Sequence, residues 1–171
     1  RLRPYGSSGA LVNPLSSLLD YYNKSAAPWE IQALLKLRIV AGSSQTGENF
    51  LEQIKSIISD TNEPENIALS IDKLRTQAIK KQNSADNESI DVKNGPGGIR
   101  DIEFLVQGLQ LMHIGQNAEL IEGNTLNAIE KLKSADVISE DTADQLNEDY
   151  VFLRTIEHWL QIYEDRQTHS I

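Results

Sequence analysis

The sequence predicts an all-α fold, a bundle of six or seven helices preceded by a short strand or hairpin. Apolar residues recur at helical spacing from Pro14 onward, and runs of polar residues, Gly and Pro separate these stretches. Only residues 1–12 alternate loosely in the manner of a strand, broken by turn-forming Pro and Gly. Two short strands are not stable alone, so we expect residues 1–13 to end an upstream sheet and residues 14–171 to form the bundle.

Each expected helix has its own apolar stripe and, in most cases, its own end signals. Pro28 stands where a helix can begin, Asn62 is a suitable N-cap, and Ser139 caps the last and longest helix. The polar, Gly-rich residues 82–98 read as a loop. The sequence therefore predicts helices over residues 15–22, 29–40, 50–58, 64–78, 99–113, 125–134 and from 140 to near the end.

Composition and charge exclude several classes of protein. The chain has 171 residues, a length typical of one domain with at most a short additional segment. Its net charge is −9, from 16 basic and 25 acidic side chains. Such a surface repels polyanions, so binding of nucleic acid or of an anionic membrane is disfavoured. The absence of Cys and the three scattered His exclude disulfides and predict no metal site. With no long apolar run and no signal peptide, we expect a soluble, cytoplasmic protein.

The chain is expected to be a piece of a longer polypeptide. Its only Met is residue 112, and it opens on RLRPYG. A site that is incomplete here would then be completed by residues upstream.

The stretch DVKNGPGGIRDIEF, residues 91–104, carries the clearest sign of chemistry. Three glycines lead into a helix N-terminus, where free backbone N–H groups and the positive end of the helix dipole favour an anion. Lys93 and Arg100 add side-chain charge, so the segment is a candidate phosphate cradle. The alternative is that the glycines only shape the loop, with Arg100 and Asp101 as solvated or ion-paired groups.

The acidic and amide residues of the next helix allow two interpretations. Asp101 and Glu103 point about 200° apart on a helix, so they cannot chelate one metal together. Glu103, Gln107 and Gln110 follow the spacing i, i+4, i+7 and form one polar stripe. Such a stripe is usually the solvent-exposed face of a helix. If another element covers it, its side chains instead form a hydrogen-bonding wall against that element.

Basic residues elsewhere offer two further candidates. Lys36 and Arg38 lie in the apolar helix 29–40, where they either snorkel or face a polar cleft, and Glu30 is a possible partner for one of them. Arg1 and Arg3 alternate on the opening strand and point to one side, which suits phosphate oxygens. The alternative for these two is a strand edge balanced by acidic neighbours.

Histidine and tryptophan suggest no chemistry of their own. His113 and His158 have apolar neighbours, which favours core-edge histidines over ligands or bases. Trp29 and Trp159 read as core or interface aromatics.

Several stretches together resemble one family, the glutamine synthetase adenylyltransferase/deadenylylases of the nucleotidyltransferase superfamily. These are RLRPYGSSGALV, WEIQALLKLRIVAG and DVKNGPGGIRDIEFLVQ, and the tail YVFLRTIEHWLQIYEDRQTHSI is also similar. The related signal-protein uridylyltransferases share the architecture with a looser match. The resemblance implies an α/β nucleotidyltransferase core followed by a helical bundle, of which residues 1–13 are the end of the core sheet.

The resemblance also implies that essential parts of the site lie outside this chain. The family's metal-binding carboxylates belong to an upstream Gly-Ser turn with Asp-x-Asp, which is not present here. We therefore expect no catalytic residue and no metal ligand in this chain, which alone should not catalyse, while the parent enzyme uses Mg²⁺ and ATP. The implied partners are glutamine synthetase and a nitrogen-signalling regulatory protein.

By resemblance, this chain supplies the second wall of the nucleotide site. The residues expected to bind nucleotide phosphates are Arg3, Lys93, Gly97, Gly98 and Arg100. Those expected to line the cleft or orient other groups are Lys36, Arg38, Asp101 and Glu103.

The family's two halves transfer AMP from ATP to a tyrosine of glutamine synthetase and remove it by phosphorolysis. GSSGALV and WEIQALLKLRIVAG favour the adenylylating half, although DRQTH also suits the removing half. The alternatives are a signal-protein uridylyltransferase domain and a non-catalytic helical protein-interaction module.

Overall fold

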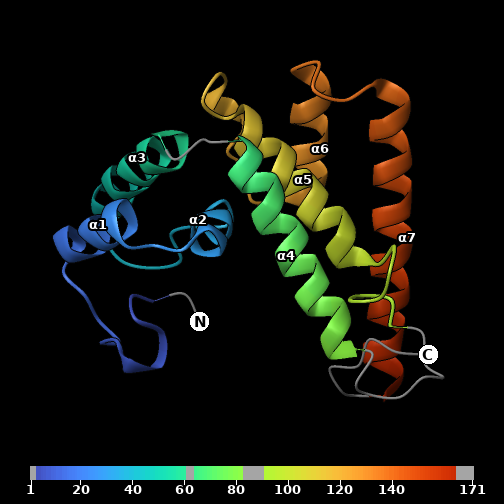
Figure 1. The fold of residues 1–171 in the computed structure, drawn as a ribbon, viewed down its shortest axis with the longest axis horizontal. Helices are drawn as coiled ribbons and strands as arrows, with labels where there is room; N and C mark the ends of the chain where they lie inside the picture. The colour runs from blue at the N-terminus through green and yellow to red at the C-terminus, as the bar shows by residue number, and fades with distance from the viewer. Residues whose placement is uncertain (1–2, 61–63, 83–90, 165–171) are drawn as a thin grey trace.

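The chain folds into a set of α-helices arranged around one central helix, α5 (Figure 1). The computed structural model describes residues 3–60, 64–82 and 91–164. Within these ranges it contains seven α-helices and two 3₁₀ helices and no strand, which confirms the all-α prediction. The elements are η1 (Gly6–Ser8), α1 (Leu15–Lys24), α2 (Pro28–Leu34), α3 (Ser44–Asp60), α4 (Pro64–Gln82), α5 (Ile99–His113), η2 (Ala118–Leu120), α6 (Thr125–Ser134) and α7 (Glu140–Glu164).

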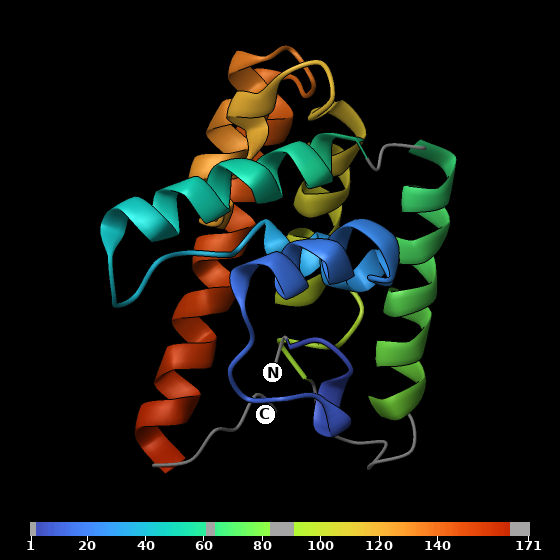
Figure 2. The same ribbon diagram turned by 90° about the vertical axis from the view of Figure 1, so that its left-hand side faces the viewer.

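Helix α5 lies between the two sides of the molecule. Helices α1, α2 and α3 gather on one side, and α6 and α7 stand on the other (Figures 1 and 2). Helix α5 contacts α2, α4, α6 and α7. Helix α5 therefore links the two sides of the molecule.

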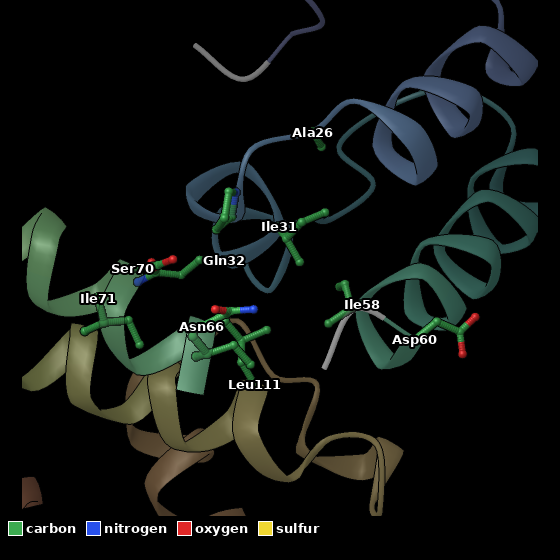
Figure 3. A pocket seen from close by; sticks show the side chains of 11 residues that line it. Ala26, Ile31, Gln32, Ile58, Asp60, Asn66, Ser70, Ile71 and Leu111 are labelled. Carbon is green, nitrogen blue, oxygen red and sulfur yellow. The ribbon is translucent and has the colours of Figure 1, made fainter. Parts of the chain in front are cut away.

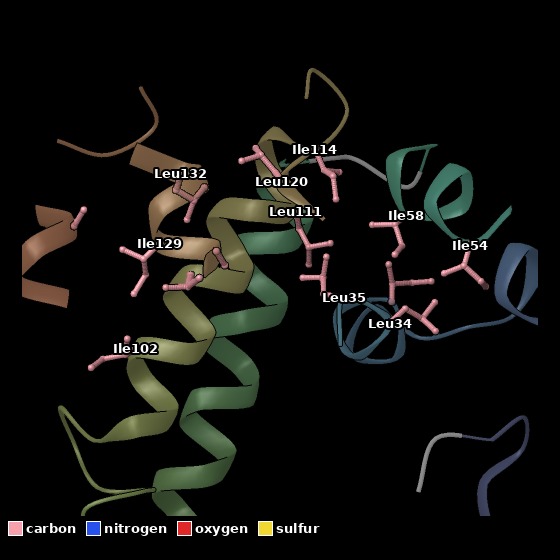
Figure 4. Close-up of a cluster of buried hydrophobic side chains, with 14 of the residues drawn as sticks. Leu34, Leu35, Ile54, Ile58, Ile102, Leu111, Ile114, Leu120, Ile129 and Leu132 are labelled. Atoms are coloured by element: carbon pink, nitrogen blue, oxygen red, sulfur yellow. The ribbon is translucent and has the colours of Figure 1, made fainter. Parts of the chain in front are cut away.

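One hydrophobic core joins the two sides (Figure 4). It runs from Ile54 and Ile58 of α3, past Leu111 of α5, to Ile129 and Leu132 of α6, and all five side chains are buried. Burying an aliphatic side chain of this size stabilises the fold by about 1.5–3 kcal/mol. The continuity of this cluster explains why the helices form one unit.

The opening segment does not form the strand that was expected. Tyr5 and Gly6 have left-handed backbone conformations, with φ of 61° and 55°, and the chain turns there into η1. The Tyr5 ring then packs edge-to-face on Tyr21 of α1, with ring centres 5.1 Å apart. Within residues 3–12 the strand prediction is therefore wrong, because the turn at Tyr5 is fixed by packing on α1. Residues 1 and 2, including Arg1, lie outside the described part.

Helix α2 is shorter than the predicted helix 29–40. It begins at Pro28 as expected but ends at Leu34, after which the amides of residues 35–37 bond three residues back. A Cβ on Gly123 would stand only 3.2 Å from Cα of Lys36, so the loop that carries this glycine packs directly on the helix end. This contact comes from 87 residues away, between Lys36 and Gly123, and has no signal in the local pattern.

The other helices form where the sequence places them, although α3 begins at Ser44, before the predicted residue 50, and α1, α3 and α4 end later than predicted. Helices α5 and α6 have the predicted limits, and the Ser139 hydroxyl accepts a hydrogen bond from the amide of Thr142, as expected of an N-cap. Helix α4 begins at Pro64, while the predicted cap Asn62 lies outside the described residues. The division into residues 1–13 and 14–171 stays a prediction. In the described ranges, no helix combines the length and apolar character needed to cross a bilayer.

Candidate functional site

The amides at the start of α5 already have partners within the chain. The N–H groups of Ile99, Arg100 and Asp101 donate to backbone carbonyls at 3.0 Å, and that of Gly97 donates to the Asp101 carboxylate at 2.9 Å. An anion cradle needs such groups to be free. The described contacts therefore correspond to the alternative, in which the glycines shape the loop.

The two expected cradle glycines are needed for the shape of this loop. Gly97 has a φ of 73°, a region that favours glycine. A Cβ on Gly98 would lie 2.7 Å from the carbonyl oxygen of Val92, so only glycine fits there. Both positions are thus explained by backbone geometry.

Lys93 is tied to a buried carboxylate of α7. Its Nζ lies 3.0 Å from Oε1 of Glu157, whose side chain is only 1% exposed. Arg154, one turn earlier on α7, donates to the other carboxylate oxygen. We call these three residues the Glu157 triad. It holds the loop before α5 against α7.

A second ion pair holds α5 against α4. Arg75 of α4 donates two hydrogen bonds to the Asp101 carboxylate, at 2.9 and 3.0 Å. Burial acts to raise the pKa of Asp101, but the hydrogen bonds from Arg75 and from the Gly97 amide outweigh it and lower the pKa. The same pairing raises the pKa of Arg75. Asp101 therefore orients Arg75 and the loop.

Arg100 differs from its basic neighbours. In the described part of the chain, no carboxylate pairs with its guanidinium, which lies 6.0 Å from the centre of the Phe104 ring. Lys93 and Arg75 are both paired. Among the described residues at this end of α5, Arg100 is thus the cation without a carboxylate partner.

The predicted stripe on α5 is covered by other elements and not by solvent. Lys36, just after α2, places its Nζ 3.1 Å from Oε1 of Glu103, and Tyr150 of α7 donates to the same oxygen at 3.1 Å. Burial raises the pKa of the Tyr150 phenol, and the nearby Glu103 charge acts in the same direction. The structure thus joins two predicted cleft residues, Lys36 and Glu103, in one contact.

The amides of the stripe are more deeply buried. Gln107 accepts a 2.7 Å hydrogen bond from Gln32 of α2, and both side chains are buried. Gln110 donates to the carbonyls of Leu120 and Glu122, at 2.6 and 2.9 Å. The interpretation as a solvent face is therefore wrong, and the hydrogen-bonding wall forms. We call Glu103, Gln107 and Gln110 the polar seam.

The remaining predicted cations lie elsewhere. Arg3 donates to the carbonyls of Gly6 and Ser7 in its own turn. In Figure 1 its segment lies beneath α1 and α2, whereas the start of α5 lies beside α7. Arg38 is exposed beyond the end of α2. The structure does not bring these two arginines to Lys93 and Arg100.

Glu30 does not pair with Lys36 or Arg38. It is buried, and its two carboxylate oxygens share the hydrogen of the Tyr21 hydroxyl, at 2.9 and 3.0 Å. One of these oxygens also accepts a hydrogen bond from the amide of Ala27 at 2.9 Å. It closes the N-terminus of α2 as a capping residue does.

The described residues offer no donor set for a metal ion. Among them, no three His, Asp or Glu side chains gather in a way that could hold one. His113 bonds the carbonyl of Leu109 at 2.9 Å in a half-buried position, as expected of a core-edge histidine. His158 is exposed, so the same expectation is wrong there.

A cavity of about 500 Å³ lies between α2, α3 and α4, away from the predicted site (Figure 3). Apolar side chains such as Ile31, Ile58 and Leu111 form most of its wall, and Gln32 and Ser70 provide polar groups. A smaller groove of about 350 Å³ runs between α4 and α5 and contains Asp101 and Arg75.

With this geometry in hand, comparison with known proteins identifies the family. The family model described as GlnD PII-uridylyltransferase matches residues 66–171, and that described as glutamate-ammonia ligase adenylyltransferase matches residues 1–53. Proteins named bifunctional glutamine synthetase adenylyltransferase/adenylyl-removing enzyme match 99% of the chain. Those of Streptomyces avermitilis, Streptomyces coelicolor and Mycobacterium tuberculosis are 41%, 38% and 36% identical.

The chain belongs to the glutamine synthetase adenylyltransferase family. It spans 17% of the length of each of these three relatives. The match of its bundle to a uridylyltransferase model places the helical part among domains that the two related enzyme types share.

Sequence reasoning missed four residues that hold α5 in place. These are Arg75, Tyr150, Arg154 and Glu157. One signal was available, because a Glu in the apolar stripe of α7, three residues after an Arg, predicts a buried charge with a cation beside it. Nothing in the local sequence indicates the link between Arg75 and Asp101.

Proposed function

We propose that this chain is the helical, substrate-side domain of a glutamine synthetase adenylyltransferase/adenylyl-removing enzyme. In this proposal the parent enzyme transfers AMP from ATP to a tyrosine of glutamine synthetase, and removes it by phosphorolysis, in the cytoplasm. The match over 99% of the chain to enzymes of that name supports the assignment. A nitrogen-signalling regulatory protein is proposed as a further partner.

The chemistry of nucleotidyl transfer is assigned to residues outside this chain. Mg²⁺ prefers several carboxylate oxygens, and the described residues do not fit it, since they contain no such cluster. In this proposal the chain binds and positions the nucleotide.

The observation that carries the proposal is that, among the described residues, no carboxylate pairs with Arg100 at the start of the central helix. Four cations around it are each paired with a carboxylate: Lys36, Arg75, Lys93 and Arg154. A guanidinium without such a partner suits a phosphate group. We propose Arg100 as the phosphate contact, with Lys93 contributing charge from a fixed position and Lys36 and Glu103 lining the approach.

Kinetics of the longer enzyme with Arg100→Gln test this role. A hydrogen bond to a charged group is worth about 1.5–3 kcal/mol, so kcat/KM for ATP should fall roughly tenfold to a hundredfold. Arg100→Lys should recover part of the loss. Lys55→Gln removes an exposed cation of α3 and is the matched control. An unchanged kcat/KM and an unchanged nucleotide affinity in Arg100→Gln would favour a non-catalytic interaction module instead.

Uridylyl transfer is the second candidate, because residues 66–171 match the uridylyltransferase family model. Activity of the longer enzyme with ATP and with UTP separates the two. Preference for ATP, with glutamine synthetase as acceptor, supports adenylyl transfer. Preference for UTP, with a small signal protein as acceptor, contradicts adenylyl transfer and supports uridylyl transfer.

A further inference from the structure

The outward face of α7 is an exposed apolar surface that nothing in the described chain covers. Phe152, Trp159, Ile162 and Tyr163 are 64%, 68%, 74% and 90% exposed. Large aromatic side chains are seldom left in water together, and such a patch usually marks an interaction site. Helix α7 stands at the edge of the molecule, so this face is open (Figure 1).

Phe152, Trp159 and Ile162 belong to a longer row of residues on α7 with coiled-coil spacing, which we call the α7 seam. Positions 141, 145, 148, 152, 155, 159 and 162 are separated alternately by four and three residues, so they lie on one side of α7. The buried residues Ala143 and Glu157 lie on the opposite side. At 1.5 Å per residue the seam is about 32 Å long, which fits one partner helix of about 20 residues.

The two halves of the seam differ in chemistry. Its first half is polar and acidic, with Asp141, Gln145 and Glu148, and its second half contains Phe152, Trp159 and Ile162. Residues 140–150 contain five carboxylates and no Lys or Arg. A helix that covers the whole seam therefore needs basic side chains at one end and apolar side chains at the other.

A second copy of this chain does not meet that need. Parallel pairing of two α7 helices would set the acidic halves against each other, and antiparallel pairing would set each acidic half against an apolar one. The net charge of −9 also opposes self-association. The relatives hold 83% of their length outside the matched region, since the chain spans 17% of it. A segment of the same polypeptide has a high effective concentration for this surface.

We infer that a basic amphipathic helix of the same polypeptide, outside these 171 residues, docks along the outward face of α7. Its apolar end covers Phe152, Trp159 and Ile162, and its Lys and Arg side chains face Asp141 and Glu148. This inference rests on the family match and does not depend on the proposed role of Arg100.

Site-specific cross-linking in the longer protein tests the docking. The photoreactive residue p-benzoylphenylalanine replaces Trp159 in one sample and Leu69 of α4, which is also 68% exposed, in the control. After irradiation, mass spectrometry identifies the attached peptide. We expect position 159 to attach to one segment of the same chain that is rich in Lys or Arg and predicted helical, and position 69 not to reach it.

Charge reversal tests the acidic half independently. Asp141→Lys with Glu148→Lys should lower the cross-link yield at position 159 about fivefold at low salt, while Glu48→Lys with Glu52→Lys on α3 should leave it unchanged. Thermal melts by circular dichroism confirm that every variant is folded. Attachment to a second copy, to another protein or to a segment without basic residues, or a yield no higher than at position 69, would overturn the inference.

Discussion

The Glu157 triad makes a quantitative prediction about stability. The carboxylate of Glu157 is 1% exposed, whereas the side chains of Lys93 and Arg154 are 32% and 37% exposed. A cation that loses its partner can therefore regain water, but the carboxylate cannot. Removing both cations takes away the two ion pairs that the structure shows at a buried carboxylate, which costs about 3–5 kcal/mol. Removing the carboxylate alone as Glu157→Gln should cost less, about 1–2 kcal/mol.

Urea unfolding followed by circular dichroism measures these differences. We expect Lys93→Met with Arg154→Met to lower the free energy of unfolding by about 3–5 kcal/mol. Adding Glu157→Leu to that pair should restore at least about half of the loss, because the buried charge is then gone. Lys24→Met is the control, since its pair with Asp20 is 69% and 68% exposed and should contribute at most about 0.5 kcal/mol.

The order of stabilities is decisive. If the triple variant is no more stable than the double variant, the cost does not come from the buried charge of Glu157. If each single cation removal costs as little as Lys24→Met, the triad does not anchor α5 to α7, and the account of a fixed helix start fails.

Three further predictions concern α5. The pKa of Asp101 is lowered in the folded state, so its pair with Arg75 should stabilise the protein at neutral pH and lose this effect as the pH falls from about 5 through the depressed pKa; Asp101→Asn should remove that part of the acid dependence of the urea midpoint. Gly108→Val should cost about 1–2 kcal/mol in urea unfolding, because its Cβ would lie 2.5 Å from Cδ1 of Ile71 and that side chain would have to move. Gln110→Leu should cost about 2–4 kcal/mol in the same assay, since it leaves two loop carbonyls without their donor.

The helix limits that the sequence predicted correctly are those with local causes. Helix α6 begins after Asn124, whose side chain accepts from the amide of Asn127, and α5 follows a glycine turn. The end of α2 was wrong because packing of Gly123 on Lys36 decides it. The opening strand was wrong in residues 3–12 for the same kind of reason, the packing of a tyrosine on α1. A window of neighbouring residues contains neither contact.

The candidate site shows the same division. Spacing placed Glu103, Gln107 and Gln110 on one face, which is correct, but helical periodicity does not reveal what covers that face. Its partners include Gln32, 75 residues away, and Lys36. The loop glycines were rightly singled out, yet whether their amides are free depends on where the carbonyls of the same loop point.

The polar seam also explains how a central helix can be held in one orientation. Apolar contacts are non-directional, so a purely apolar α5 could rotate or slide between its neighbours at small cost. Each residue of the polar seam instead has partners on other elements. Glu103 bonds Lys36 and Tyr150, and Gln107 bonds Gln32. Gln110 bonds the end of η2 and the loop after it. A rotation would leave several buried polar groups unpaired at about 1–3 kcal/mol each. The polar seam therefore fixes the direction of α5 and, through it, the position of Arg100, the proposed phosphate contact.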